Sequence, residues 1–108
     1  MKTDINEVRI AGTVASSHFG QIAGRGYARM VIATKWTYEG PNGVTVADIT
    51  EHVVTAFENS RIQDLDKIET GTRVEVVGRI QSQRYTNKDG DGVMTYGILA
   101  SSVRVIND

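Results

Sequence analysis

The sequence contains no cysteine. This absence excludes disulfide bridges, cysteine-ligated zinc sites and thiol catalysis, and it agrees with the reducing cytoplasm, where we expect the protein to reside. Hydrophobic runs are short. None approaches the ~20 residues that a membrane-spanning helix needs, and the opening segment MKTDINEV lacks the apolar core of a signal peptide. We therefore expect no membrane association.

An excess of charge of one sign is also missing. The chain has 12 Lys and Arg against 13 Asp and Glu, a formal net charge of −1. A strongly basic domain would indicate nucleic-acid binding. A nearly neutral one does not exclude it, because affinity depends on where the cations lie. With one proline, 40% hydrophobic and 23% charged residues in 108 positions, the composition is that of one ordinary globular domain, covering residues 1–108.

Apolar residues that alternate along the chain predict five strands. Three are expected at residues 6–14, 27–38 and 44–57, and residues 70–106 are expected to form a hairpin around a polar loop at 87–92. Residues 15–26 hold three glycines without periodicity and predict a loop. Between the third and fourth strands, Ile62, Leu65 and Ile68 recur every three residues. This spacing predicts an amphipathic helix of about three turns over residues 58–69.

The order of three strands, a helix and two strands is that of the OB-fold, a five-stranded Greek-key barrel of the all-β class. Mid-strand glycines at positions 12 and 78 suit strands that coil sharply, and the apolar stripe of the helix is expected to close one end of the barrel. Another small β-barrel or an open α+β sheet fits the same element order.

Residues that could carry catalysis are sparse. His18 falls in the predicted loop, His52 shares the alternation of the core residue Val54, and neither has a partner at a metal-ligand spacing. The acidic loop NKDGDG lacks the spacing and terminal acid of a calcium loop. We therefore expect a non-enzyme without metal or cofactor, and an unrecognised enzyme or small-ligand barrel is the least favoured hypothesis.

Binding chemistry is better represented. On the strand that begins the hairpin, one face carries an arginine, two glutamines and an aromatic ring: Arg79, Gln81, Gln83 and Tyr85. Trp36 and Tyr38 share the alternation of the core residues of their strand, so a regular strand turns them inward, whereas a bulge or strong coiling releases them. Phe57 either points outward or packs under the helix, and alternation alone does not decide between the two.

Aromatic rings interleaved with cations on a sheet surface are what a single strand of nucleic acid requires, because bases stack on rings while Lys and Arg neutralise phosphates. The candidate cations lie on the predicted strands and hairpin tip: Arg25, Arg29, Lys35, Arg73, Arg79, Arg84 and Lys88. Their clustering near the aromatics predicts a local basic groove on a nearly neutral domain.

Several segments, in order and spacing, resemble the bacterial single-stranded-DNA-binding proteins: NEVRIAGTV, ARMVIAT, EHVVTAF, TGTRVEVVGRI and QSQRYTNKDGDGVMTYGILASSV. The resemblance implies an OB-fold, usually a homotetramer, that binds and protects single-stranded DNA with little sequence preference during replication, recombination or repair. It places stacking aromatics at Tyr38, Phe57 and Tyr85, which favours exposure of Phe57. Trp36, two residues before the usual aromatic position, substitutes for that ring or supplements it.

With the resemblance included, the expected DNA-binding residues are Trp36, Tyr38, Phe57, Tyr85, Lys35, Arg79, Gln81, Arg84, Lys88, Arg29 and Arg73. Two departures from the family pattern stand out. A tryptophan common in the family falls on Glu51, and the usual glycine- and proline-rich tail with an acidic tip, which recruits replication and repair proteins, is not found. We therefore expect a trimmed or tailless member.

Two alternatives remain. One is a dimeric adaptor resembling primosomal replication protein N, which binds single-stranded DNA and replication-restart proteins. The other is an assembly domain whose outward aromatics are buried at subunit contacts.

Overall fold

The computed structural model describes residues 3–106. Its five strands are β1 (Val8–Ile22), β2 (Arg25–Glu39), β3 (Thr45–Phe57), β4 (Arg73–Thr86) and β5 (Gly92–Val105). They form a closed barrel in the order β1-β2-β3-β5-β4. The closure is a short parallel pairing in which Val54 and Thr55 of β3 lie opposite Ile98 and Leu99 of β5. The predicted all-β OB-fold barrel is confirmed.

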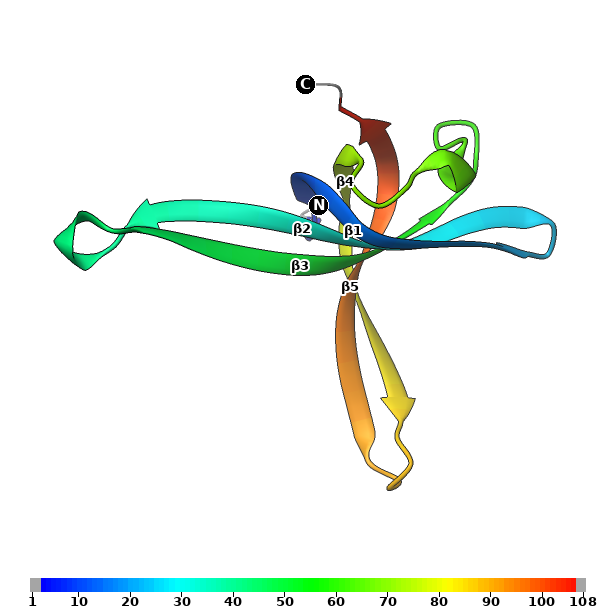
Figure 1. The fold of residues 1–108 in the computed structure, drawn as a ribbon. Helices are drawn as coiled ribbons and strands as arrows, with labels where there is room; N and C mark the ends of the chain where they lie inside the picture. The colour runs from blue at the N-terminus through cyan, green and yellow to red at the C-terminus, as the bar shows by residue number, and fades with distance from the viewer. Residues whose placement is uncertain (1–2, 107–108) are drawn as a thin grey trace.

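The strands are longer than the barrel, and three hairpins project from it in different directions (Figure 1). The β2–β3 hairpin forms one arm, the β4–β5 hairpin a second, and the end of the β1–β2 hairpin a third, opposite the first. The outer parts of the β2–β3 and β4–β5 arms are exposed on both faces, whereas Phe19 of the β1–β2 hairpin packs against the core. Among residues 3–106, no helix is long and apolar enough to cross a membrane.

The predicted loop at residues 15–26 is wrong. β1 continues to Ile22, and β2 begins at Arg25 after a two-residue turn. Ala23 and Gly24 both have positive φ, 52° and 77°, the backbone of a tight hairpin turn whose twist matches the strands. A register shift between Val14 and Ser16 marks a bulge in β1. The small residues that hid the alternation therefore form a strand that bends as it leaves the barrel.

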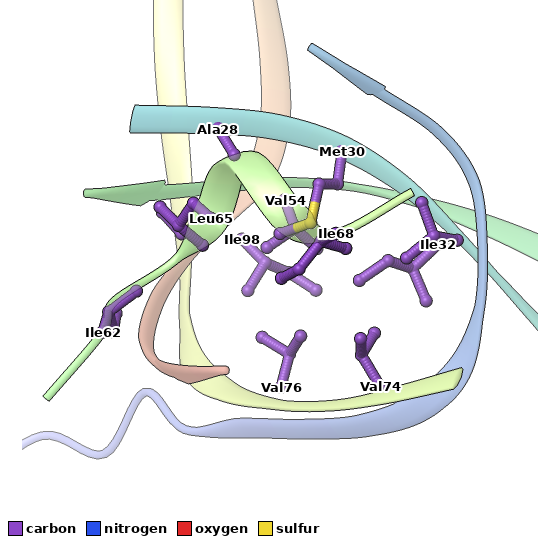
Figure 2. Close-up of a cluster of buried hydrophobic side chains, with 12 residues drawn as sticks. Ala28, Met30, Ile32, Val54, Ile62, Leu65, Ile68, Val74, Val76 and Ile98 are labelled. Atoms are coloured by element: carbon purple, nitrogen blue, oxygen red, sulfur yellow. The ribbon is translucent and has the colours of Figure 1, made fainter. Parts of the chain in front are cut away.

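The core fills the barrel with aliphatic side chains from every strand (Figure 2). Met30 and Ile32 of β2 lie against Val54 of β3 and against Val74 and Val76 of β4, all with no accessible surface. These residues follow the alternation read from the sequence, since side chains at i and i+2 share one face of a strand.

The predicted three-turn helix is also wrong. Residues 58–72 form an irregular segment with one 3-10 turn at Leu65–Lys67. The Asn59 side chain accepts the N–H of Arg61 at 2.7 Å and that of Ile62 at 2.9 Å, and Asp64 adopts the left-handed region at φ 59°. The Asn59 bonds are those of a helix N-cap, but the left-handed backbone of Asp64 stops a continuous α-helix, because the chain changes direction there after less than two turns.

The apolar residues of this segment nevertheless do what the helix was expected to do. Ile62, Leu65 and Ile68 are all buried in the core cluster, and Figure 2 shows Ile68 beside Met30, with Leu65 and Ile62 to one side of them. The three-residue spacing was therefore a correct sign of burial and an incorrect sign of α-helix.

Candidate nucleic-acid interface

A groove of about 600 Å³ runs between the outer face of the β2–β3 pair and the β4–β5 arm. The pairing register of β4 with β5 and of β2 with β3 determines which side chains form its walls. Gln81 lies opposite Gly97 and Gln83 opposite Thr95, so these side chains share one face of the arm with Tyr85. Arg29 lies opposite Thr55 and forms the other wall. The remaining lining residues are Val53, Tyr96 and Ile98.

The lining chemistry combines a ring, a cation and neutral hydrogen-bonding groups. Tyr85 is 53% exposed, so a face of its ring is available to a ligand. Glutamine amides and threonine hydroxyls both donate and accept hydrogen bonds, and Arg29 supplies the positive charge. None of the lining residues is acidic. The groove is therefore suited to a polyanion that carries flat, polar bases.

Three of the residues predicted from the sequence line this groove: Arg29, Gln81 and Tyr85. The three predicted cations of β4, Arg73, Arg79 and Arg84, do not. Arg79 lines a separate shallow hollow with Asn6 and Leu99. Arg73 lies at the start of β4, where its Nη1 donates to Thr13 Oγ1 at 3.3 Å. The single basic groove expected from the sequence is therefore divided among several surfaces.

Trp36, Tyr38 and Lys35 lie on the β2–β3 arm, outside the groove lining. Trp36 is 73% exposed, and Tyr38 is exposed as well. The β2–β3 register has no shift, so a bulge did not release the two rings. They are exposed because the strand has left the barrel, and the face that is buried at Met30 has no core to cover it further along.

Phe57, at the end of β3, is half-buried. Its ring centroid lies 6.2 Å from that of Tyr27, and the Arg25 guanidinium lies over the Phe57 ring at 5.3 Å. Arg25 is held there by its Nε, which donates to the Glu58 carbonyl at 2.8 Å. A base that stacks on Phe57 from this side has to displace the guanidinium or stack against it.

Arg84 and Lys88 belong to the end of the β4–β5 arm. Arg84 pairs with Met94 and alternates to the face opposite Tyr85. Lys88 lies in the turn. Asn87 holds this turn together, because the Asn87 Oδ1 accepts hydrogen bonds from the N–H groups of Asp89 and Asp91, each at 3.0 Å. Both cations are exposed, and in Figure 1 the tip of this arm lies far from the tip of the β2–β3 arm.

Sequence reasoning missed several lining residues, among them Thr55 and Thr95. Their alternation was visible, but a hydroxyl on a strand is common and carries no specific signal. Ser17 and His18 were assigned to the mistaken loop, although the structure places both on β1, with His18 directly opposite Arg29.

A second charged cluster occupies a different surface, across β1, β4 and β5. Glu75 accepts hydrogen bonds from Arg9 Nη2 at 2.7 Å and Arg104 Nη2 at 2.9 Å, and its side chain is only 16% exposed. The hydrogen bond from Arg9, followed by that from Arg104, lowers the pKa of the Glu75 carboxyl below its usual 4.5. This cluster links three strands and leaves the groove untouched.

Within residues 3–106, no group of three or more His, Cys, Asp or Glu side chains is placed to hold a metal ion. The groove has no nucleophile beside a base, and its hydroxyls belong to threonine and tyrosine side chains. What the arrangement offers is binding: a ring for stacking, a cation for phosphate and amides for base edges. The barrel and this site together define an OB-fold domain of the nucleic-acid-binding class.

Comparison with known proteins identifies the family. Residues 5–106 match the model of the single-strand binding protein family, and the chain belongs to that family. The sequence resemblance is thereby confirmed over nearly the whole chain. No curated protein matches the sequence.

Solved structures share the fold at low identity. The chain is similar to the Plasmodium falciparum SSB in complex with ssDNA, with a TM-score of 0.84 and 16% identity over 99% of both chains. It is similar to the small single-stranded DNA-binding protein of Streptomyces coelicolor, with a TM-score of 0.73 and 18% identity over 96% of both chains. It is also similar to a deletion mutant of the Thermus aquaticus single-stranded DNA binding protein, with a TM-score of 0.75 and 16% identity. That match covers 95% of this chain and 51% of the Thermus aquaticus chain.

Proposed function

We propose that this chain binds single-stranded DNA without sequence preference. The observation that carries the proposal is the groove between the β2–β3 pair and the β4–β5 arm, in which Tyr85, Arg29 and neutral amides meet with no acidic residue in the lining. Family membership and the fold of the similar structures support it.

The groove explains how binding without sequence preference works. Every base has a flat face that stacks on an aromatic ring, and such stacking contributes about 1–3 kcal/mol per base. Arg29 attracts phosphate, which is identical in every nucleotide. Gln81 and Gln83 lie side by side on the arm, and their amides can rotate to pair with different base edges. Nothing in this lining reads a particular base.

The exposed rings of the β2–β3 arm extend the proposal. Trp36 and Tyr38 are two residues apart on one strand and therefore share a face. The contact of apolar ring surface with water is unfavourable, so covering an exposed aromatic ring with a partner lowers the free energy. We include both, with Phe57 and the cations Lys35, Arg73, Arg79, Arg84 and Lys88, as further contacts for a strand that passes over more than one surface.

Fluorescence anisotropy with labelled oligo-dT tests the proposal. We expect binding that weakens as salt rises, because bound cations release counterions from the DNA. Tyr85→Ala is expected to weaken binding by about 1–3 kcal/mol. Met94→Ala, on the opposite face of the same arm, is the matched control and is expected to leave affinity unchanged. Absence of binding even at low salt would sink the proposal.

We further propose that the chain assembles as a homotetramer. Residues 8–12 of β1 pair with β4 on one edge, whereas pairing with β2 begins only at Thr13. Among the described residues the other edge is therefore unpaired, and such an edge invites pairing with another strand. Beside it lies an apolar hollow of about 340 Å³ lined by Val8, Val53, Ile80 and Tyr96, among others. A second copy is suited to cover both features.

Light scattering with and without oligo-dT tests the assembly. A tetrameric mass that falls in Ile80→Asp supports the proposal, whereas a dimeric mass would favour the adaptor alternative. The double change Phe57→Ala and Tyr85→Ala separates the two uses of the aromatics. We expect it to weaken DNA binding and preserve the assembly. Loss of the assembly with retained binding would indicate that these rings serve subunit contacts.

The cellular role follows from the same chemistry. Single strands are exposed during replication, recombination and repair, and we propose that the chain protects them there, in the cytoplasm, alongside replication or repair proteins. Family membership supports this assignment. A fluorescent fusion that forms foci after DNA damage, and fails to do so with Tyr85→Ala, is the expected result. Foci that persist in the variant would argue against DNA binding as their cause.

A further inference from the structure

The tip of the β2–β3 arm holds an Asn-Gly pair, Asn42 and Gly43, in the short turn between the two strands. Figure 1 shows this tip at the far end of the arm, away from the barrel. Both residues are exposed, and both have positive φ, 65° at Asn42 and 73° at Gly43. Asparagine tolerates this left-handed backbone better than most residues do. The turn is therefore open to water, on a part of the arm where no residue is buried.

Asn42 differs from the other asparagines that the structure describes in the freedom of its side chain. Asn6 both donates to and accepts from a backbone peptide group. Asn59 and Asn87 each accept two backbone N–H groups through Oδ1, at distances of 2.7–3.0 Å. Asn42 is exposed, and its carboxamide forms no hydrogen bond with another residue of the described chain. This carboxamide is therefore free to rotate.

The backbone N–H that follows Asn42 is also weakly held. The Gly43 nitrogen donates to the Gly40 carbonyl at 3.3 Å, which is longer than is usual for such a bond. Apart from its chain neighbours, the nearest atom to a Cβ built at Gly43 is the Glu39 Oε1, at 3.5 Å. The shorter bond at this tip, from the Gly40 N–H to the Val44 carbonyl at 2.7 Å, lies outside the pair. The pair can therefore move while the two strands stay joined.

A free carboxamide followed by an open glycine nitrogen is what deamidation through a cyclic imide requires. The Gly43 nitrogen loses its proton to a base in solution and attacks Asn42 Cγ, after the Asn42 ψ has rotated away from its 21°. The new bond joins that nitrogen to Cγ, the bond from Cγ to Nδ2 breaks, and Nδ2 leaves as ammonia with a proton taken from water. Water then opens the ring. Opening at Cγ gives an aspartate, and opening at the main-chain carbonyl gives an isoaspartate whose backbone runs through Cβ.

We propose that Asn42 is a deamidation site, selected by its free side chain and loosely held neighbour, and that the carboxylate formed there weakens the contact of DNA with the β2–β3 arm. The co-reactant is water. The product adds a negative charge close to the Glu39 carboxylate, on the arm that carries the exposed Trp36 ring. The effect on DNA rests on the proposed function, whereas the chemistry of the site does not.

Peptide mapping by mass spectrometry tests the site. The intact protein is incubated in mildly alkaline buffer, and the amide, aspartate and isoaspartate forms of each asparagine peptide are quantified over time. We expect the Asn42 peptide to convert while the peptides of Asn6, Asn59 and Asn87 keep their amides. Asn42→Gln is expected to leave this peptide unconverted, because the longer side chain closes a less favourable six-membered ring. An Asn42 peptide that keeps its amide as long as the other three do would overturn the proposal.

Lys88→Gly is the matched test of the structural argument. It creates a second Asn-Gly pair at the tip of the β4–β5 arm, where two backbone N–H groups hold the Asn87 Oδ1. We expect Asn87 in this variant to convert several-fold more slowly than Asn42 in the same molecule. Equal rates at the two tips would overturn the selection of Asn42 by its free side chain.

Asn42→Asp has the charge of the product and reports its effect on binding. A carboxylate about 10 Å from a phosphate in water lowers affinity about twofold, and we expect oligo-dT binding at low salt to weaken by about this factor. The difference should shrink as salt rises, and the neutral Asn42→Gln should bind as wild type does. Equal affinity of wild type and Asn42→Asp at low salt would overturn the effect on DNA. If wild type binds no oligo-dT, the proposed function fails together with this effect, while the conversion of Asn42 still decides the site.

Discussion

The side-chain amide of Asn6 forms both hydrogen bonds of a strand pair with the backbone of Ile80. Its Nδ2 donates to the Ile80 carbonyl at 2.7 Å, and its Oδ1 accepts the Ile80 N–H at 2.9 Å. The last backbone pair between β1 and β4 is Val8 with Gly78. Asn6 therefore continues this pairing at the point where β4 leaves the barrel, and it fixes the direction of the arm that carries Tyr85.

Asn6→Ala is expected to lower the free energy of unfolding by about 1 kcal/mol, because two solvent-exposed hydrogen bonds are lost. We also expect weaker oligo-dT binding, since the β4–β5 arm can then tilt away from Arg29. Urea denaturation and anisotropy measure the two effects. Glu7→Ala, an exposed change in the same segment, is the control. Unchanged binding in Asn6→Ala would show that the arm holds its position without Asn6.

The Glu75 cluster is expected to make the free energy of unfolding depend on pH in the acidic range. Arg9 and Arg104 lower the pKa of the Glu75 carboxyl below 4.5 in the folded protein. As the pH falls, Glu75 is therefore protonated in the unfolded chain at a higher pH than in the folded one. The stabilisation is complete above pH 4.5 and is lost as the pH falls through the lowered pKa. Urea midpoints measured across this range should decline less steeply in Glu75→Gln than in wild type. Glu69→Gln, at an exposed site, should keep the wild-type slope.

Gly12 is required by close packing of two backbones. A Cβ at this position would collide with the carbonyl oxygen of Ala33, so Gly12→Ala is expected to destabilise the barrel by about 1–3 kcal/mol. Gly92→Ala provides the control, because nothing lies within 4 Å of the Cβ it would add, and surface changes of this kind stay within about 0.5 kcal/mol. Equal melting temperatures for the two variants would contradict the prediction.

Trp36 is the only tryptophan of the chain, so its fluorescence reports contact with the β2–β3 arm directly. We expect oligo-dT to quench it, and we expect Trp36→Ala to weaken binding by about 1–3 kcal/mol through the loss of one stacked base. Val44→Ala, also an exposed apolar residue of this arm, should bind as wild type does. A fluorescence signal that is unaffected by bound DNA would remove the arm from the interface.

The number of strands, most of their positions and much of the core were readable from the sequence because alternation is a local property, whereas the β1–β2 hairpin at residues 15–26 was not. Val54 was assigned to the interior and is buried, and the alternating residues Met30, Ile32, Val74 and Val76 are buried with it. The irregular segment at residues 58–72 was not readable, since a three-residue apolar spacing suits both an α-helix and a chain pinned by side-chain hydrogen bonds. What decided between them was the left-handed backbone of Asp64 together with the Glu58 Oε2 that accepts the Leu65 N–H at 3.1 Å.

The sequence by itself determined the five-stranded barrel, its aliphatic core and the family, because alternation, glycine placement and motif order are all written along the chain. Only the tertiary structure decided which candidate residues meet. Trp36 and Tyr85 looked alike as strand-end aromatics, yet one lies on a free arm and the other in a groove with Arg29. The physical reason is that strands longer than the barrel leave it in directions set by register and coiling, and these long-range properties bring Arg29 and Tyr85 together.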